Sequence, residues 1–228
     1  MKYIILNPKT PEDIVLNAEK KGFKVVMADY ISGIDSSVAG HPDMHLVKIG
    51  NTLVVNPGSY AYYKKQMPDI DIVCGKTVVQ GKYPEYTAYN IALLGSFALH
   101  NFKYTDSVAL SLIEKGYKKI NVNQGYTKCS VVALPDSIIT ADKGIISSAV
   151  SAGIKCLEIT SGYVKLECKE YGFLGGATGF YNGTLYVAGD LKNHPDYIKI
   201  ENFCKEKCIE ICCLSNDKLA DIGSIIIV

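Results

Sequence analysis

The chain has 228 residues, of which 48% are hydrophobic and 21% are charged. This composition excludes disordered and fibrous proteins and is typical of a globular domain with a sizeable core. Its 24 basic and 23 acidic residues leave a net charge of only +1, which argues against nucleic acid or a membrane as a partner and favours a small molecule or a protein.

All 24 basic residues are lysines, so the chain contains no arginine. Without a guanidinium group, an anionic ligand can be held only by lysine, by backbone N–H groups or by hydroxyls. A general bias of the genome towards lysine is the simpler explanation of this composition. In a pocket built on Asp and His, however, the absence of arginine favours a cationic ligand over an anionic one.

The first residues, MKYIILNPKTPED, contain a single lysine and only a short apolar run before Asn7 and Pro8. They match neither a signal peptide nor a transmembrane span. The eight cysteines are then expected to be reduced thiols rather than a disulfide framework. We therefore expect a cytoplasmic protein.

Two segments near the N-terminus look like copies of one another. Residues 4–8 (IILNP) precede a helix-length stretch and an apolar strand at 24–29, and residues 53–57 (LVVNP) are followed in the same way by a strand at 71–75. Similar strand–helix–strand runs begin near residues 97, 138 and 185. The recurrence predicts five units, although an ordinary α/β domain with evenly spaced strands is the alternative.

A further strand precedes four of these units, across turns such as Gly50-Asn51 and Asn182-Gly183 that favour hairpins. The first unit has none, but residues 223–228 can supply it by pairing with residues 3–6. The unit is thus strand, turn, strand, helix, strand. Five units would close a ring in one domain, residues 1–228, because each unit needs a neighbour on both sides. The four leading strands are residues 45–49, 91–94, 130–134 and 179–181.

The segments that lead into the first strand of each unit should meet near the axis of such a ring. They are more polar than the strands, and two of them align directly, since residues 86–93 read YTAYNIAL and residues 126–133 read YTKCSVVA. Equivalent positions therefore carry different chemistry. The five segments are residues 40–45, 86–90, 126–130, 172–176 and 219–223.

His41, Asp43 and His45 fall within five residues of the first of these segments. In an extended strand, alternation would place all three side chains on one face. This pattern is compatible with acid–base chemistry, with a purely structural polar cluster, or with a metal site for zinc or iron. A metal site would need further ligands that the sequence does not indicate.

Cys129 is the only cysteine in a leading segment, and most of the others are expected to be small core residues. Cys204, Cys208 and Cys212 have a spacing that resembles a metal site. Their interval crosses a predicted change from helix to strand, which argues against that interpretation.

Glycines at 175, 176 and 179 could suggest a phosphate loop, but no Gly-Lys-Ser/Thr motif follows them. We interpret them as allowing close approach of the backbone near the axis. Asp142 and Asp190 precede helical stretches and are predicted to cap them. Asp190 could alternatively form a site at the rim together with His194.

A fivefold ring of ββαβ units, with one cysteine and a histidine on its axis, resembles the pentein fold of guanidino-group-modifying enzymes. Those enzymes include arginine and agmatine deiminases, dimethylarginine hydrolases and amidinotransferases. His41-Pro42-Asp43 resembles the family's His-x-Asp segment, and Gly125 to Cys129 resembles its nucleophile segment, about two units later. The resemblance implies an α/β fold, a five-bladed propeller closed by the N- and C-terminal strands.

The resemblance also implies roles for individual residues. Cys129 would be the nucleophile and His41 the acid/base, while Asp43 and Asp221 would hold the guanidinium or amidinium group, in a hydrolase or deiminase without metal or cofactor. The implied substrate is a small cationic guanidine or amidine, and a homodimer is possible. Lys128 is a weaker candidate for activating the thiol, because neighbours in a strand point to opposite faces. The implied substrate-binding residues are Asp43, His45, Tyr89, Asn90, Gly175 and Gly176.

The order of these residues implies a circularly permuted member. The family's nucleophile lies in the C-terminal unit, where this chain has Asp221-Ile222-Gly223-Ser224 and no cysteine. The chain also lacks long insertions that would form a substrate lid. The family includes a ribosome-binding initiation factor that is not an enzyme, so the alternative is a non-catalytic protein that binds a small ligand or a protein partner.

Overall fold

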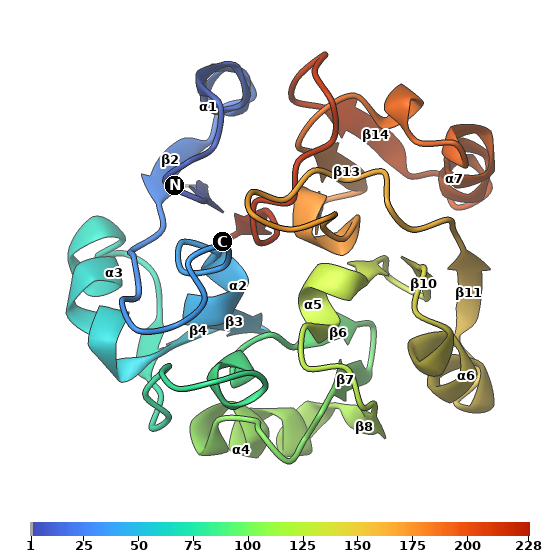
Figure 1. Ribbon diagram of the computed structural model, residues 1–228. Coiled ribbons are helices and arrows are strands. Elements are labelled where there is room, and N and C mark those ends of the chain that lie inside the picture. The colour runs from blue at the N-terminus through green and yellow to red at the C-terminus, as the bar shows by residue number, and fades with distance from the viewer. Residues whose placement is uncertain (1) are drawn as a thin grey trace.

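The computed structural model describes residues 2–228 and consists of five three-stranded sheets arranged around one axis. Each sheet has an antiparallel inner pair, joined through a tight turn in four of the five sheets, and an outer strand that runs parallel to the middle strand after a helical crossover. This is the predicted order of strand, turn, strand, helix and strand. Figure 1 shows the sheets as blades of a ring with the crossover helices on the outside.

The blades follow the chain. The first has β15 (Ile226–Ile227), β1 (Tyr3–Leu6), α1 (Glu12–Lys20) and β2 (Lys24–Met27), and the second has β3 (Leu46–Ile49), β4 (Thr52–Val55), η1 (Pro57–Ser59), α3 (Tyr60–Gln66) and β5 (Ile72–Cys74). The third has β6 (Ala92–Leu94), β7 (Phe97–His100), α4 (Ser107–Gly116) and β8 (Lys118–Asn121). The fourth has β9 (Val132–Ala133), β10 (Ser137–Thr140), α6 (Lys143–Ser151) and β11 (Lys155–Glu158), and the fifth has β12 (Thr178–Tyr181), β13 (Thr184–Val187), η4 (Leu191–Asn193), α7 (Tyr197–Lys205) and β14 (Glu210–Cys213).

The two ends of the chain close the ring, as predicted. Ile4 of β1 pairs with Ile227 of β15, and the backbone N–H of Tyr3 donates to the carbonyl of Val228 at 2.8 Å. Without this pair, β1 would present an unpaired inner edge. The first blade is therefore built from both ends of the chain.

The two Asn-Pro sequences form the same local structure. Asn7 Oδ1 accepts a hydrogen bond from the N–H of Lys9, and Asn56 Oδ1 accepts one from the N–H of Gly58, both at 2.9 Å. Each asparagine thus forms an Asx turn that directs the chain from the middle strand to the crossover helix.

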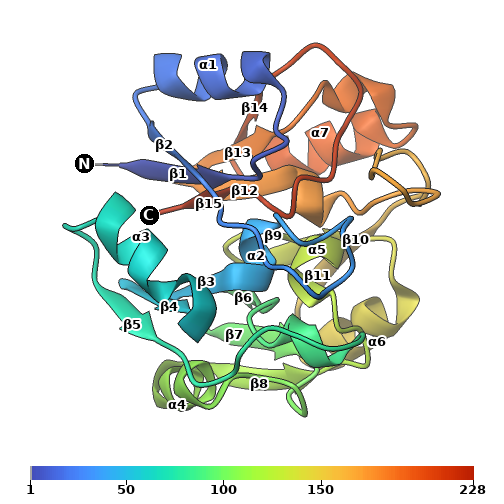
Figure 2. The same cartoon turned by 60° about the vertical axis from the view of Figure 1, so that its left-hand side comes forward.

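Buried apolar residues bind neighbouring blades together. One core cluster contains Ile5 of the first blade and Leu53 of the second, and another contains Val54 of the second and Ala98 of the third. Since each inner strand packs between its neighbours, the blades share their core instead of each having one of its own. Figure 2 shows how α1, α3 and α4 surround this core from outside.

The segments that lead into the inner strands are helical turns, and the prediction that residues 41–45 are extended is wrong. Residues 42–45 form α2 (Pro42–His45) and residues 127–130 form α5 (Thr127–Ser130). At the axis these segments have no neighbouring strand with which to form a ladder, so helical bonds such as Ser130 N–H to Tyr126 O, 2.9 Å, satisfy their backbone. Two further leading segments contain η2 (Glu85–Thr87) and η3 (Gly175–Ala177).

None of the helices found in residues 2–228 is long and apolar enough to span a membrane.

Candidate active site

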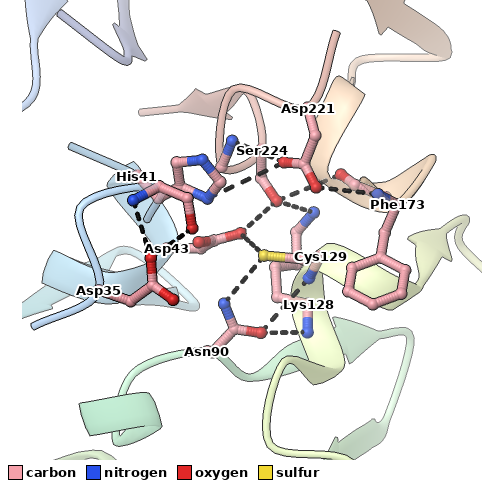
Figure 3. Close-up of polar contacts among 12 residues, drawn as sticks. Asp35, His41, Asp43, Asn90, Lys128, Cys129, Phe173, Asp221 and Ser224 are labelled. Carbon is pink, nitrogen blue, oxygen red and sulfur yellow. Dashed lines mark hydrogen bonds and ion pairs between the residues drawn. The ribbon is translucent and has the colours of Figure 1, made fainter. Parts of the chain in front are cut away.

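A cluster of buried polar side chains lies on the axis, where the leading segments of four blades meet (Figure 3). Asp43 belongs to α2 and Cys129 to α5, while His41 immediately precedes α2. Asp221 lies in the segment that leads into β15. All four are almost inaccessible to solvent, with exposed fractions of 1% for His41 and Asp43, 2% for Cys129 and 7% for Asp221.

The thiol of Cys129 lies between a carboxylate and an amide. Its Sγ donates a hydrogen bond to Oδ2 of Asp43 at 2.9 Å, and Nδ2 of Asn90 donates to the sulfur at 3.3 Å. Asp43 thus accepts a hydrogen bond from the thiol, while Asn90 supplies a donor that would stabilise negative charge on the sulfur.

Asn90 also fixes the turn that carries the cysteine. Its Oδ1 accepts hydrogen bonds from the backbone N–H groups of Lys128 at 2.7 Å and Cys129 at 3.3 Å. These N–H groups lie at the start of a short helix, where no intrahelical acceptor is available. One side chain therefore caps the turn and contacts the sulfur.

His41 and Asp221 form the second part of the cluster. Nδ1 of His41 lies 3.9 Å from Oδ1 of Asp221, which is an ion-pair distance rather than a hydrogen bond. The backbone N–H groups of Phe173 and Gly223 hold the two carboxylate oxygens at 2.9 and 3.0 Å. A ring nitrogen of His41, the Cys129 sulfur and a carboxylate oxygen of Asp221 all lie within 4.8 Å of one another.

Two polar atoms of the cluster have no hydrogen-bond partner within residues 2–228. They are Nδ1 of His41 and Oδ1 of Asp43, and both are buried. An unsatisfied buried polar atom costs free energy, so a ligand with donor groups would complete the hydrogen bonding of Asp43.

Burial sets the protonation states in this cluster. It raises the pKa of the Cys129 thiol well above its ordinary value, and the negative charges of Asp43 and Asp221 raise it further. Burial also raises the pKa of Asp43, against the opposing effect of His41, and lowers the pKa of Lys128. Burial and the two carboxylates therefore both favour the protonated thiol.

Lys128 and Ser224 belong to the cluster, although the sequence analysis gave Lys128 little weight and missed Ser224. Nζ of Lys128 donates to Oγ of Ser224 at 3.1 Å, and Ser224 donates to Oδ2 of Asp43 at 2.6 Å. In a strand, Lys128 and Cys129 would point to opposite faces. In a helical turn, successive side chains are separated by about 100° rather than 180°, so Lys128 and Cys129 can serve the same site. The position of Ser224, one residue beyond the last leading segment, was the only sequence signal for it.

The proposed binding residues His45 and Tyr89 make their polar contacts elsewhere. The His45 ring contacts Oγ of Ser59 at 3.2 Å and the carbonyl of Ala39 at 3.0 Å, and burial lowers its pKa to about 4. The Tyr89 hydroxyl donates to the carbonyl of Thr77 at 2.9 Å. His45 was placed in the site on strand alternation, which the helical turn of α2 removes.

Gly175 and Gly176 allow the leading segments to pack together. A Cβ atom on Gly175 would lie 2.5 Å from the carbonyl oxygen of Cys129, and one on Gly176 would lie 2.0 Å from Oδ1 of Asp221. Both distances are far shorter than any van der Waals contact. The interpretation of these glycines as points of close approach is confirmed.

The other sequence candidates have structural roles. Asp142 accepts from the N–H of Ile145 and Asp190 from that of Lys192, so both cap helices as predicted. The His194 ring contacts the carbonyl of Thr160 and the N–H of Asp196, each at 3.1 Å, rather than Asp190. Within residues 2–228, Cys204, Cys208 and Cys212 do not form a group able to hold a metal, and the group that does assemble is His41, Cys129 and Asp221.

Solved structures of guanidino-group-modifying enzymes share the fold. DDAH from Pseudomonas aeruginosa, complexed with citrulline, has a TM-score of 0.56 and 8% identity, covering 93% of this chain and 91% of that chain. Agmatine deiminase of C. jejuni with substrate bound has a TM-score of 0.57 and 12% identity, covering 98% and 92%. SxtG, an amidinotransferase from Microseira wollei, has a TM-score of 0.57 and 9% identity, covering 95% and 77%.

The five-bladed arrangement and these similarities define a pentein-fold protein, as the sequence resemblance implied. Within this class, the chain belongs to the family described as "Family of unknown function (DUF6873)", which it matches over residues 5–226. A search of the curated proteins finds no match.

Proposed function

We propose that this protein is a cysteine-dependent hydrolase or deiminase that acts on a guanidine or amidine compound. The observation that carries the proposal is the position of the Cys129 sulfur, 2.9 Å from Asp43 and within 4.8 Å of both His41 and Asp221. A thiol nucleophile, an imidazole and two carboxylates are thus present in one buried cluster. The similar solved structures are named as enzymes of guanidino chemistry, which agrees with this arrangement.

The carboxylates suit a planar cation. Amidinium and guanidinium groups present N–H donors along their edges and form charge-assisted hydrogen bonds with carboxylates. Oδ1 of Asp43 is free to accept such a bond, whereas both oxygens of Asp221 already accept backbone N–H groups. Asp43 is therefore the primary anchor, and Asp221 contributes its charge and orients His41.

Binding of the cation would also activate the thiol. Burial raises the pKa of Cys129, the charges of Asp43 and Asp221 raise it further, and a bound amidinium offsets these two charges. The thiol then transfers its proton to His41, which becomes the proton donor of the next step, and Asn90 stabilises the thiolate through Nδ2. The empty site keeps the cysteine protonated, so the nucleophile forms when the substrate is present.

The reaction then proceeds in two halves. The thiolate forms a C–S bond to the amidinium carbon, and a C–N bond breaks as His41 donates a proton to the departing ammonia or amine. Water next attacks the same carbon, His41 accepts one of its protons, and the C–S bond breaks to return the thiolate. The balance is one amidinium and one water converted to a carbonyl compound and an ammonium ion.

The test is turnover of a panel of guanidine and amidine compounds, with release of ammonia or amine and of the carbonyl product measured together. Cys129→Ser is expected to lower turnover by at least about a thousandfold. Cys74→Ser, at an exposed cysteine, is the matched control and should retain activity. Full activity of Cys129→Ser on a confirmed substrate would exclude the mechanism.

A second candidate function is binding without catalysis, through the same axial cluster. The observation that favours it is that the thiol of Cys129 is buried and donates a hydrogen bond to Asp43, which keeps the thiol protonated. Alkylation at near-neutral pH in the presence of a bound amidine separates the two functions. A catalytic Cys129 should react faster than the other seven cysteines, whereas uniformly slow labelling favours a binding protein.

A further inference from the structure

A cavity of about 270 Å³ lies on the axis of the ring, and inner strands from all five blades line it. Its volume exceeds the roughly 150 Å³ of an apolar cavity that holds a benzene ring, so it can hold a short organic chain. The residues of β3, β6, β9, β12 and β15 on its walls include Val47, Leu93, Ala133, Phe180 and Ile226.

One end of this cavity is formed by groups of the candidate active site. Asp43 and Lys128 both line it, and Oδ1 of Asp43 is buried without a partner among the described residues. The other oxygen of the same carboxylate contacts the sulfur of Cys129. Cys129 does not itself line the cavity, so a head group that binds Asp43 at this end reaches the sulfur beside the carboxylate that the sulfur contacts.

The cavity walls combine aliphatic side chains with polar groups, and a cation lies in the lining away from Asp43. Nζ of Lys48 donates to the carbonyl of Ile227 at 3.0 Å and lies 6.0 Å from the ring centre of Tyr181. Lys48 and Tyr181 both line the cavity and lie near the hairpin turns of their blades. A second cation on a ligand would be repelled there, while a neutral or anionic end would not.

The opposite side of the cluster is closed by the chain itself. Residues 164–173 run beside the segment that carries Asp221, through hydrogen bonds from Lys165 N–H to Leu219 O and from Asp221 N–H to Lys165 O, both 2.8 Å. The N–H of Phe173 holds the Asp221 carboxylate on the same side. The axial cavity therefore offers a ready space beside Asp43 that needs no displacement of these contacts.

We propose that the axial cavity holds the substrate tail, a short unbranched aliphatic chain that carries the amidinium or guanidinium group at Asp43 and ends in a neutral or anionic group near Lys48. This inference rests on the proposed function for the identity of the reacting group. The tail contributes affinity because its methylene groups leave water for the aliphatic walls. The carboxylate of Asp43 selects the charged head, and Lys48 excludes chains with a second cation.

The experiment measures binding in the Cys129→Ser protein, in which turnover is suppressed. Straight-chain alkylamidines of increasing length are titrated calorimetrically. Each added methylene is expected to tighten binding by up to about fourfold until the cavity is full. The same chains ending in an ammonium group should bind more weakly, and Lys48→Met should reduce that difference.

Ala133→Trp tests the location, because it fills the cavity from β9. It should abolish the dependence on chain length, whereas Glu158→Trp, on the exposed side of β11 in the same blade, should preserve it. Leu93→Trp replaces Ala133→Trp if the latter does not fold.

The failure of this inference can be distinguished from the failure of the proposed function. Length-dependent binding without turnover of any compound supports the cavity and opposes the hydrolase. If the compounds are turned over but their affinity changes neither with chain length nor in Ala133→Trp, the assignment of the tail to this cavity is overturned.

Discussion

The thiol of Cys129 donates a hydrogen bond to Oδ2 of Asp43, with 2.9 Å between the sulfur and the oxygen, although the two residues are 86 positions apart in the chain. Each lies in the turn that leads into the inner strand of its blade, three residues before that strand begins. The contact therefore joins equivalent positions of two repeats, and it keeps the nucleophile protonated while the site is empty.

Asp43→Asn should lower the pKa of Cys129, because it removes a negative charge that raises this pKa. The alkylation rate of Cys129, followed by peptide mass spectrometry against pH, should shift its midpoint to lower pH. Turnover of amidines should fall at the same time, since the cation loses its anchor. An unchanged midpoint would show that Asp43 does not control the thiol.

Asn90→Ala should lower the free energy of unfolding by about 1–3 kcal/mol, because it leaves the buried N–H of Cys129 without an acceptor and leaves the N–H of Lys128 only the backbone carbonyl of residue 90, at 3.2 Å. Denaturant titration measures the loss. Asn51→Ala, at an exposed hairpin turn, is the control and should change stability by less than about 0.5 kcal/mol. Equal effects of the two substitutions would contradict the capping role.

Stability should fall as the pH drops from about 6.5 towards 4, because burial lowers the pKa values of His45 and His100 to about 4. An unfolded chain protonates these rings near pH 6.5, whereas the folded protein keeps them neutral, so acid favours unfolding. Each histidine should contribute about 2 kcal/mol of this loss between pH 7 and pH 5. His100→Gln should reduce the slope of unfolding free energy against pH, and an unaltered slope would refute the assignment.

Lys169→Met should make Cys129 more accessible with little effect on stability. The ion pair from Lys169 to Asp35, 2.5 Å, ties the segment beside Asp221 to the loop that precedes His41. An ion pair this exposed stabilises the fold by no more than about 1 kcal/mol. The alkylation rate of Cys129 should nevertheless rise severalfold, while Lys155→Met, which removes a comparable pair with Glu206, should leave it unchanged. Equal rates in both variants would mean that this loop does not limit access.

Joining the two ends of the chain and opening it elsewhere should preserve the fold. The N–H of Tyr3 bonds to the carbonyl of Val228 at 2.8 Å, so a short glycine linker can connect them. New ends at the exposed Gly50-Asn51 turn should leave thermal unfolding cooperative and within a few degrees of the parent. New ends within β4, at Val54, should prevent folding because they interrupt a middle strand. A permutant at the turn that fails to fold would contradict closure of the ring by the two ends.

The repeat could be recognised from the sequence because each blade must satisfy the same local requirements. The inner strands need apolar residues on both faces, the turns need Gly or Asn, and Asn7 and Asn56 direct the chain in the same way. These are short-range constraints, and they appear as short-range patterns. The closing strand at residues 226–227 also followed from the sequence, since one inner strand was otherwise missing.

The sequence alone also placed His41, Asp43, Asn90, Cys129 and Asp221 at the axis, because they occupy the leading segments of the repeat. Which of them touch was decided by the tertiary structure. Where the leading segments converge, α2 and α5 form helical turns instead of strands. This change removes His45 from the cluster and brings in Lys128, which contacts Ser224 of the segment before β15. The orientation of a side chain in such a turn depends on contacts between blades, which local periodicity does not encode.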